Sequence, residues 1–178
     1  MDDCAALRLA LDLLHVPWRA KVLRSEPLPR GVPLLLRIAG GDVEADRVAK
    51  GVMGRSGDVL HAAAAFFIEQ ILLHPEADNY RVLGATPDAT AGELRRNMAW
   101  LMAWLHPDRA PKTERSVLVA RVTRAWNDLK TPDRRAAYDE AQRRSVTRAG
   151  TIPRVRRRNA GLPGRRGILS FLLGRRPL

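Results

Sequence analysis

Residues 90–108, TAGELRRNMAWLMAWLHPD, predict a helix with a well-defined start and end. Thr90 and Glu93 have the Thr-x-x-Glu spacing of a capping box, in which both side chains satisfy backbone groups at a helix start. Apolar side chains then recur on one helix face, at Leu94, Met98, Leu101 and Leu105. Pro107 lacks a backbone N–H and disfavours a helical conformation at His106, so the helix must end at or just before His106.

A second amphipathic helix is predicted over about residues 114–130, where apolar side chains recur at Leu118, Val119, Val122, Ala125, Trp126 and Leu129. Two such helices joined by a short loop pack antiparallel with their apolar faces together. The loop His106-Pro107-Asp108 would then lie at the tip of a helical hairpin. Thr131 and Pro132 have the form of an N-cap and a first helical position, so a short further helix should reach Asp139.

Five blocks of sequence in this part of the chain share the order and spacing of a known domain. They are Asp78-Asn79-Tyr80-Arg81-Val82-Leu83-Gly84, the helix start from Ala89 to Arg96, His106-Pro107-Asp108, Ala125-Trp126-x-x-Leu129, and Arg135-Ala136-Ala137-Tyr138-Asp139 with Pro132 before it. Together they resemble the J-domain of the DnaJ family, over about a third of the chain. The tripeptide alone would be a weak signal, whereas five blocks in register are specific.

The resemblance implies a protein partner. J-domains bind DnaK-type heat-shock ATPases and stimulate their ATP hydrolysis. By this resemblance Asp108 offers a carboxylate to an arginine of the partner, while His106 and Pro107 hold the loop in shape. Arg95 and Arg96 would contribute to the basic helix face that meets the acidic surface of the chaperone. The chain would break no bond itself, so we do not expect an enzyme. The alternative is that the tripeptide only ends a helix and turns the chain.

One departure from the family concerns the helix before the loop. Its later basic positions are Ala99, Trp100 and Trp104 here, and Met98 stands where the family usually has tyrosine. At helical spacing the two tryptophans lie off the predicted core face. The favoured interpretation is that they pack against the N-terminal region of the same chain. The alternative is a secondary interface, a modified docking surface for a specialised chaperone or another protein.

Residues 1–75 are expected to form a separate helical region, with helices over about residues 3–15, 33–38, 42–53 and 57–73. Residues 27–33 are rich in proline and glycine and are expected to form a loop. The last helix is apolar nearly all round. It is shorter than the roughly 20 residues that cross a membrane and it contains Glu69, so a buried helix covered by the J-like region is expected. The region resembles, without a diagnostic motif, the helical TerB-like domains found beside some bacterial J-domains.

Chemistry-bearing motifs are not apparent elsewhere. The four histidines have no metal-ligand spacing, and no nucleophile–base or paired-carboxylate arrangement is found. We therefore expect no cofactor, no metal and no small-molecule substrate. The single cysteine, Cys4, and the acidic start of the sequence give no sign of disulfides or of a secretory signal, which favours a cytoplasmic protein.

The net charge of +12 is concentrated at the C-terminal end. Eleven arginines and no acid follow Glu140, which leaves about +1 for residues 1–140. We divide the chain into residues 1–75, residues 76–142 and a flexible basic tail over residues 143–178. An apolar segment within the tail, residues 167–174, is bracketed by arginine pairs.

This tail predicts a polyanionic partner. An anionic membrane surface is the first candidate, which would place the protein peripherally at the inner face of the membrane; the contacts would come from Arg156, Arg157, Arg158, Arg165, Arg166, Phe171, Arg175 and Arg176. Nucleic acid ranks lower, because the tail has only one aromatic residue for base stacking. A solubilising or docking tail is equally compatible with the charge.

The sequence as a whole predicts an all-α protein, with a bundle of short helices packed on a J-domain. The predicted function is that of a co-chaperone for a DnaK-type ATPase. The alternative is a J-like adaptor or scaffold without chaperone stimulation, tethered by its basic tail.

Overall fold

The computed structural model describes residues 4–106 and 112–150, and within these ranges every regular element is a helix. The all-α class is therefore confirmed. The loop residues Pro107 and Asp108 and all of residues 151–178 lie outside the described residues, and with them the eight predicted contact residues of the tail.

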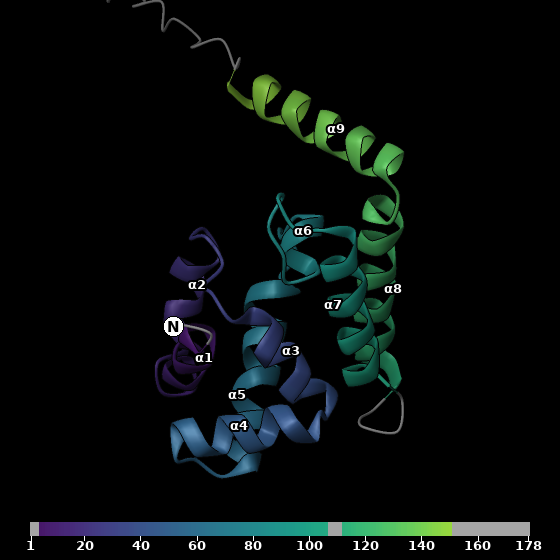
Figure 1. The fold of residues 1–178 in the computed structure, drawn as a ribbon. Coiled ribbons are helices and arrows are strands. Elements are labelled where there is room, and N and C mark those ends of the chain that lie inside the picture. The colour runs from purple at the N-terminus through teal and green to yellow at the C-terminus, as the bar shows by residue number, and fades with distance from the viewer. Residues whose placement is uncertain (1–3, 107–111, 151–178) are drawn as a thin grey trace, which may run out of the picture.

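The N-terminal helices are assembled around α5 (Gly57–Phe67). Helices α1 (Ala5–His15), α3 (Val32–Gly40) and α4 (Val43–Met53) all contact it (Figure 1). Its continuation is a π-helical turn, η2 (Ile68–Leu72), in which the Leu73 N–H donates to the Ile68 carbonyl at 2.8 Å. The long apolar helix predicted over residues 57–73 is thus present, and its side chains are the centre of the core.

A short helical segment that the sequence pattern did not predict follows α1. It consists of a 3-10 turn, η1 (Pro17–Arg19), and α2 (Ala20–Leu23). Only Ala20 and Leu23 point inward and are buried, so the segment is too short to show a helical period. The Arg24 guanidinium fixes it by donating to the backbone carbonyl of Gln70 at 2.9 Å and to the side-chain oxygen of Gln70 at 3.0 Å.

The second half of the molecule contains the predicted helical hairpin. It is formed by α7 (Ala91–Trp104) and α8 (Lys112–Leu129), which run antiparallel, with a single-turn helix, α6 (Asn79–Val82), packed on α8 (Figure 1). The capping box is present: the Glu93 N–H donates to the Thr90 hydroxyl at 3.2 Å, and the Thr90 N–H donates to the Glu93 carboxylate at 2.7 Å. α7 begins and ends where the capping residues and Pro107 predict.

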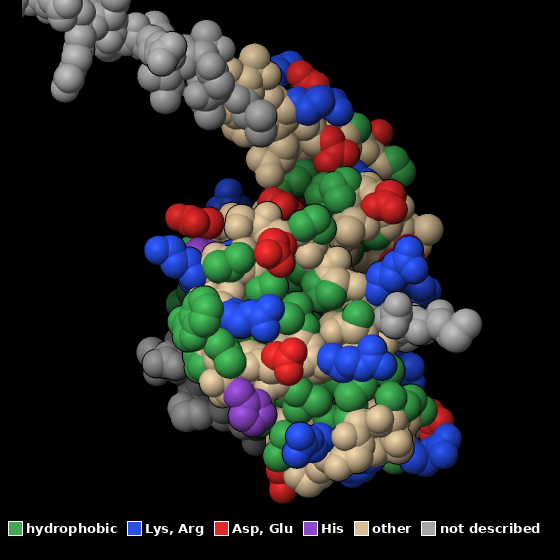
Figure 2. Space-filling view, turned by 90° about the vertical axis from the view of Figure 1, so that its left-hand side faces the viewer, with side chains coloured by type: hydrophobic (Ala, Val, Ile, Leu, Met, Phe, Trp, Pro, Cys, Tyr) green, Lys and Arg blue, Asp and Glu red, His purple; other side chains and the backbone are tan. Residues whose placement is uncertain are grey.

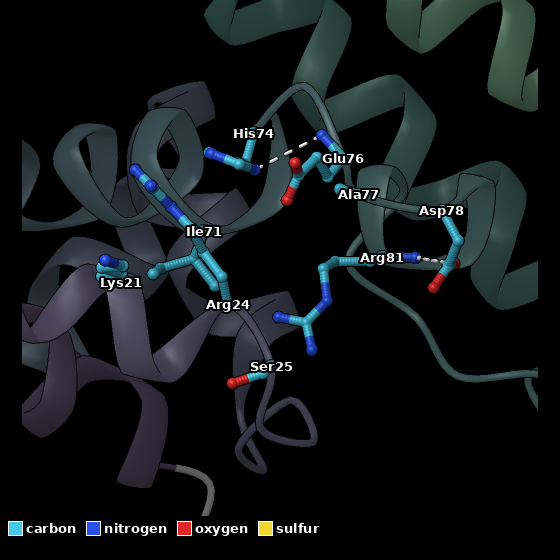
Figure 3. A pocket seen from close by; sticks show the side chains of 9 residues that line it. All are labelled: Lys21, Arg24, Ser25, Ile71, His74, Glu76, Ala77, Asp78 and Arg81. Atoms are coloured by element: carbon cyan, nitrogen blue, oxygen red, sulfur yellow. Dashed lines mark hydrogen bonds between the residues drawn. The ribbon is translucent and has the colours of Figure 1, made fainter. Parts of the chain in front are cut away.

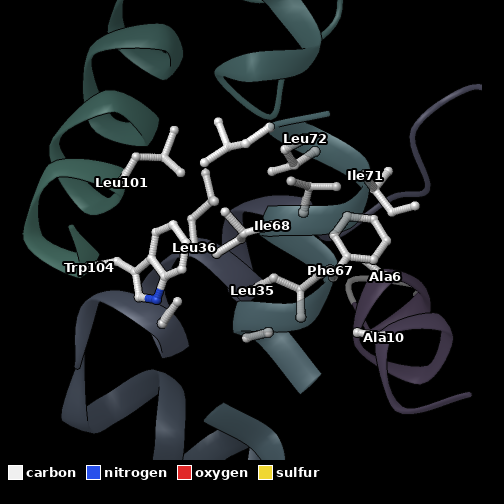
Figure 4. Close-up of a cluster of buried hydrophobic side chains, with 14 of the residues drawn as sticks. Ala6, Ala10, Leu35, Leu36, Phe67, Ile68, Ile71, Leu72, Leu101 and Trp104 are labelled. Atoms are coloured by element: carbon white, nitrogen blue, oxygen red, sulfur yellow. The ribbon is translucent and has the colours of Figure 1, made fainter. Parts of the chain in front are cut away.

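Helix α3 joins the two halves. It packs on α5 with one face and on α7 with another, so the main contact of the hairpin with the bundle runs through α3 rather than directly through α5 as expected. Buried side chains form one continuous core across this junction, among them Leu35, Leu36, Ile68, Leu101 and Trp104 (Figure 4). Gly84 allows the close approach: a side chain there would lie 2.9 Å from a Val32 methyl group.

The last helix is longer than predicted. α9 (Pro132–Gly150) continues past the expected end at Asp139 and past the proposed boundary at residue 142, and it projects from the body (Figure 1). Glu140 accepts hydrogen bonds at 2.9 Å from both Arg143 and Arg144, at the i+3 and i+4 spacing that supports a solvent-exposed helix. No proline or glycine interrupts residues 133–149. The helix therefore continues past the proposed start of the tail at residue 143.

Candidate functional site

The loop end of the hairpin carries the first of the predicted partner-binding residues. The His106 side chain is exposed at the end of α7, and its backbone N–H lies 3.4 Å from the Ala103 carbonyl in the last helical turn. Pro107 and Asp108, the other two residues of the predicted motif, lie outside the described residues. The described residues therefore show where the loop begins, at the end of α7.

Arg115 holds the base of this loop together. Its guanidinium donates to the carbonyl of Trp104 at 3.0 Å and to the carbonyl of His106 at 3.1 Å, and it lies over the Trp104 ring, 5.8 Å from the centroid. The last carbonyls of a helix have no intrahelical partner and carry partial negative charge, so a cation there stabilises the end of α7. Arg115 comes from the first turns of α8 and thus ties the two sides of the loop together.

The sides of α7 have different surroundings. α8 covers one side and α3 covers another, which leaves a narrow exposed strip that includes Arg95, Arg96, Ala99 and His106. The predicted pair Arg95 and Arg96 is thus in water, one to two helical turns from the capping box. This strip presents only two arginines before the loop.

The two tryptophans pack inside the chain. Trp104 is only 6% exposed, and Trp100 is half-buried against α3, where a side chain at Gly40 would lie 2.7 Å from its ring. This confirms the favoured interpretation of packing against the N-terminal region. The buried ring of Trp104 leaves almost no surface for a partner, and a secondary interface that includes Trp100 stays a prediction. Gly40 provides the space that this packing needs.

The far end of the hairpin is fixed by a polar cluster around two tyrosines. The Tyr80 hydroxyl donates to Asp139 at 2.8 Å and accepts from Arg135 Nε at 2.9 Å. The Tyr138 hydroxyl accepts the Asn79 N–H at 2.9 Å, and the two rings meet edge to face with centroids 5.8 Å apart. Burial first, and the neighbouring Asp139 second, raise the pKa of Tyr80, so its hydroxyl stays protonated and can donate. These bonds attach α9 to α6.

Another arginine fixes the connection between the halves. Arg121 of α8 donates to the backbone carbonyls of His74, Pro75 and Ala77, the last two at 2.8 and 3.1 Å. Burial lowers the pKa of this arginine. The connection from η2 to α6 is therefore bound along its length by one side chain of the hairpin. Neither Arg121 nor Arg115 was predicted, because their partners are backbone carbonyls that no sequence motif marks.

Among the described residues, no group of three His, Cys, Asp or Glu side chains is placed to hold a metal. A hollow of about 650 Å³ lies between α2, the 74–78 connection and α6, and its lining mixes cations with the acids Glu76 and Asp78 (Figure 3). None of the described helices is long and apolar enough to cross a membrane.

Comparisons with known proteins match one part of the chain. Residues 78–139 match the DnaJ domain family model. The chain is 40% identical over 63 residues to chaperone protein DnaJ of Leifsonia xyli subsp. xyli, and 37% identical over 68 residues to chaperone protein DnaJ 1 of Mycobacterium leprae. These alignments cover 35% and 38% of this chain but only 17% and 18% of the two relatives. No solved structure gave a significant match. The chain therefore carries a J-domain at residues 78–139, a family that is generally non-catalytic.

Proposed function

From the J-domain at residues 78–139 we propose that this protein is a co-chaperone that binds a DnaK-type heat-shock ATPase and stimulates its ATP hydrolysis. The observation that carries the proposal is the rigid base of the loop. Arg115 joins the end of α7 to the start of α8 by two hydrogen bonds, so the two helix ends that flank the loop are fixed relative to each other. Fixing these ends reduces the conformational freedom that is lost on binding.

The proposed mechanism is allosteric. Asp108 donates no proton and attacks no bond; its carboxylate accepts charge-assisted hydrogen bonds from an arginine of the partner. The protein raises the partner's ATPase rate only insofar as it binds the hydrolysis-competent state more tightly than the other state. Arg95 and Arg96 on the exposed strip of α7 add attraction to an acidic surface, mainly through the rate of encounter.

The test is an ATPase assay with the full chain and DnaK-type chaperones of a bacterium. We expect stimulation by the wild type and loss of about 90% or more of it in His106→Gln and in Asp108→Asn, because a lost charge-assisted contact is equivalent to at least tenfold in binding. Asp58→Asn, at an exposed aspartate of α5, is the matched control and should stimulate like the wild type. Absence of stimulation by the wild type would contradict the proposal.

A second candidate is an adaptor that keeps the J-domain fold but does not stimulate a chaperone. It is favoured by α7, whose exposed strip has only two arginines and whose tryptophan side is occupied by α3. In this case, proteins captured by the full chain would not depend on Asp108. Equal capture by the wild type and Asp108→Asn, together with no stimulation, would support the adaptor.

Location is part of the proposal. We place the protein in the cytoplasm, with attachment at the inner face of the membrane supplied by the arginines of residues 154–176. Binding of the full chain and of a 1–150 truncation to anionic vesicles and to DNA, in low and high salt, would test this. Salt-sensitive vesicle binding that the truncation weakens would support it.

A further inference from the structure

The segment η1–α2 presents an apolar surface to water. Trp18 is 74% exposed and is the only exposed aromatic side chain among the described residues. Val22, one helical turn further on, is 52% exposed. The inward positions Ala20 and Leu23 are buried, so the two apolar side chains stand outward from an anchored segment.

Basic residues lie next to Trp18 and Val22 in the sequence. Arg19 and Lys21 are exposed and Arg24 is half-buried, while the nearest acids along the chain are Asp12 and Glu26. Arg24 bonds to the neutral amide side chain and carbonyl of Gln70, so that contact does not neutralise its charge. Figure 2, which views the molecule from the side of α1 and α2, shows hydrophobic side chains beside lysine and arginine. The surface therefore combines an apolar centre with two exposed cations, Arg19 and Lys21, on a face that also carries acidic side chains (Figure 2).

Hydrogen bonds from the J-domain also fix the segment η1–α2 in place. Arg81 of the J-domain donates to the backbone carbonyls of Leu23 and Glu26, and together with Arg24 it lines the hollow beside α2 (Figure 3). Both guanidiniums point into the body, whereas Trp18 and Val22 remain in water. The outward position of these two side chains is thus a built feature of the fold.

We propose that Trp18, Val22 and the neighbouring cations Arg19 and Lys21 form a contact site for an anionic membrane surface. The indole and the valine would enter the headgroup region, where tryptophan is preferred, and Arg19 and Lys21 would lie near lipid phosphates. A protein partner fits less well, because one tryptophan and one valine fall far short of the roughly 800 Å² per side of a specific interface. The site does not depend on chaperone binding.

The position of α9 supports the same partner. α9 slants from the end of α8 toward the side of the molecule that carries α2 (Figure 1), and eight arginines follow residue 150 in the sequence. Two weak contacts with one vesicle act together, since the first raises the effective concentration of the second. The arginine-rich end alone would bind without orientation, and the α2 surface would orient the body.

The first experiment compares two matched double variants of the full chain by sedimentation with vesicles of phosphatidylcholine and phosphatidylglycerol. Trp18→Ser with Val22→Ser removes the proposed site. Val43→Ser with Val52→Ser removes two exposed apolar side chains of α4, which are 81% and 55% exposed. We expect the first pair to weaken binding about tenfold and the second pair to leave it unchanged. Equal affinities of the first pair and the wild type would overturn the proposal, even if both bind through the arginines.

The second experiment locates the indole. Lipids brominated near the headgroup should quench part of the wild-type tryptophan fluorescence, and Trp18→Phe, which keeps an apolar side chain, should abolish that quenching while binding is retained. The other three tryptophans are buried or half-buried, so they contribute little. Quenching that persists in Trp18→Phe would place the contact elsewhere. If the Trp18→Ser, Val22→Ser variant lost a protein partner but not vesicles, the membrane assignment would be wrong.

Discussion

Different kinds of contact stabilise the N-terminal helices and the J-domain. In residues 4–73 the core is largely aliphatic, and α1 and α5 approach closely through small buried side chains such as Ala6, Ala10 and Ala64. In the J-domain, hydrogen bonds from Arg115, Arg121 and the Tyr80 cluster fix the ends of the helices. Apolar contacts bring the helices together, whereas directional bonds fix the loop and the last helix in place. A domain that must present a loop needs the second kind.

The largest loss of stability is expected where the N-terminal helices and the J-domain share a core. Trp104→Ala should lower the free energy of unfolding by about 3–5 kcal/mol, because a buried indole is lost and the space between α3 and α7 fills only in part. Urea denaturation would measure this. Trp18→Ala, at a 74% exposed indole, is the control and should change the stability by less than about 0.5 kcal/mol. Similar losses in both variants would contradict a core that continues across the junction.

A smaller effect is expected at the close approach between the regions. Gly84 has φ +61°, and an added methyl group would lie 2.9 Å from Val32 and 3.2 Å from Leu36. Gly84→Ala should therefore cost about 2–4 kcal/mol, combining a left-handed backbone with overpacking. Gly51→Ala is the control: it lies in α4 with open space around it, and alanine there should be neutral or stabilising. Thermal unfolding of both variants would show the difference.

Removing the Tyr80 hydroxyl tests how far hydrogen bonds stabilise the J-domain. Tyr80→Phe eliminates the bonds to Asp139 and Arg135 and should cost about 1–2 kcal/mol in unfolding free energy. Because these bonds attach α9 to α6, amide hydrogen exchange of residues 132–140 should also become faster. Ser25→Ala, which removes an exposed hydroxyl, is the control. Unchanged exchange in Tyr80→Phe would mean that the Tyr80 hydroxyl does not hold α9 in place.

The smallest expected effect concerns pH and the capping box. Hydrogen bonds from the Thr90 backbone and hydroxyl hold the pKa of Glu93 below its ordinary value of 4.5. A carboxylate whose pKa is lower in the folded state stabilises the fold above the unfolded pKa, and that stabilisation is lost as the pH falls through the folded pKa. Stability measured from pH 6 to pH 3 should thus fall less steeply in Glu93→Gln, which removes the titrating group, than in the wild type. An identical slope in the two proteins would mean that Glu93 does not contribute to the pH dependence of stability.

The long helices and the hairpin could be predicted because their signals are local. The capping box, the apolar spacing and Pro107 mark both ends of α7, and the five blocks mark the J-domain. α2 was missed because four residues cannot show a period. α9 was predicted too short because composition argued for a tail, whereas the bonds of Glu140 to Arg143 and Arg144 support a helix.

The residues that fix the site could not be predicted for another reason. Arg115 and Arg121 act on backbone carbonyls, and any residue type supplies such a carbonyl. The burial of Trp100 and Trp104 was inferred from their unusual apolar character on a helix face, but the partner, α3 with Gly40, is about sixty residues away in sequence. Spacing within a helix reveals its faces and not what covers them.

Because α3 packs on α7, this J-domain is unsuitable for transfer to another protein as an isolated domain. Cutting the chain before Asp78 would remove α3 from Trp104 and Leu101 and leave an exposed apolar surface on the excised domain. A chimera or a minimal fragment should therefore begin no later than Val32, or replace both tryptophans with polar residues.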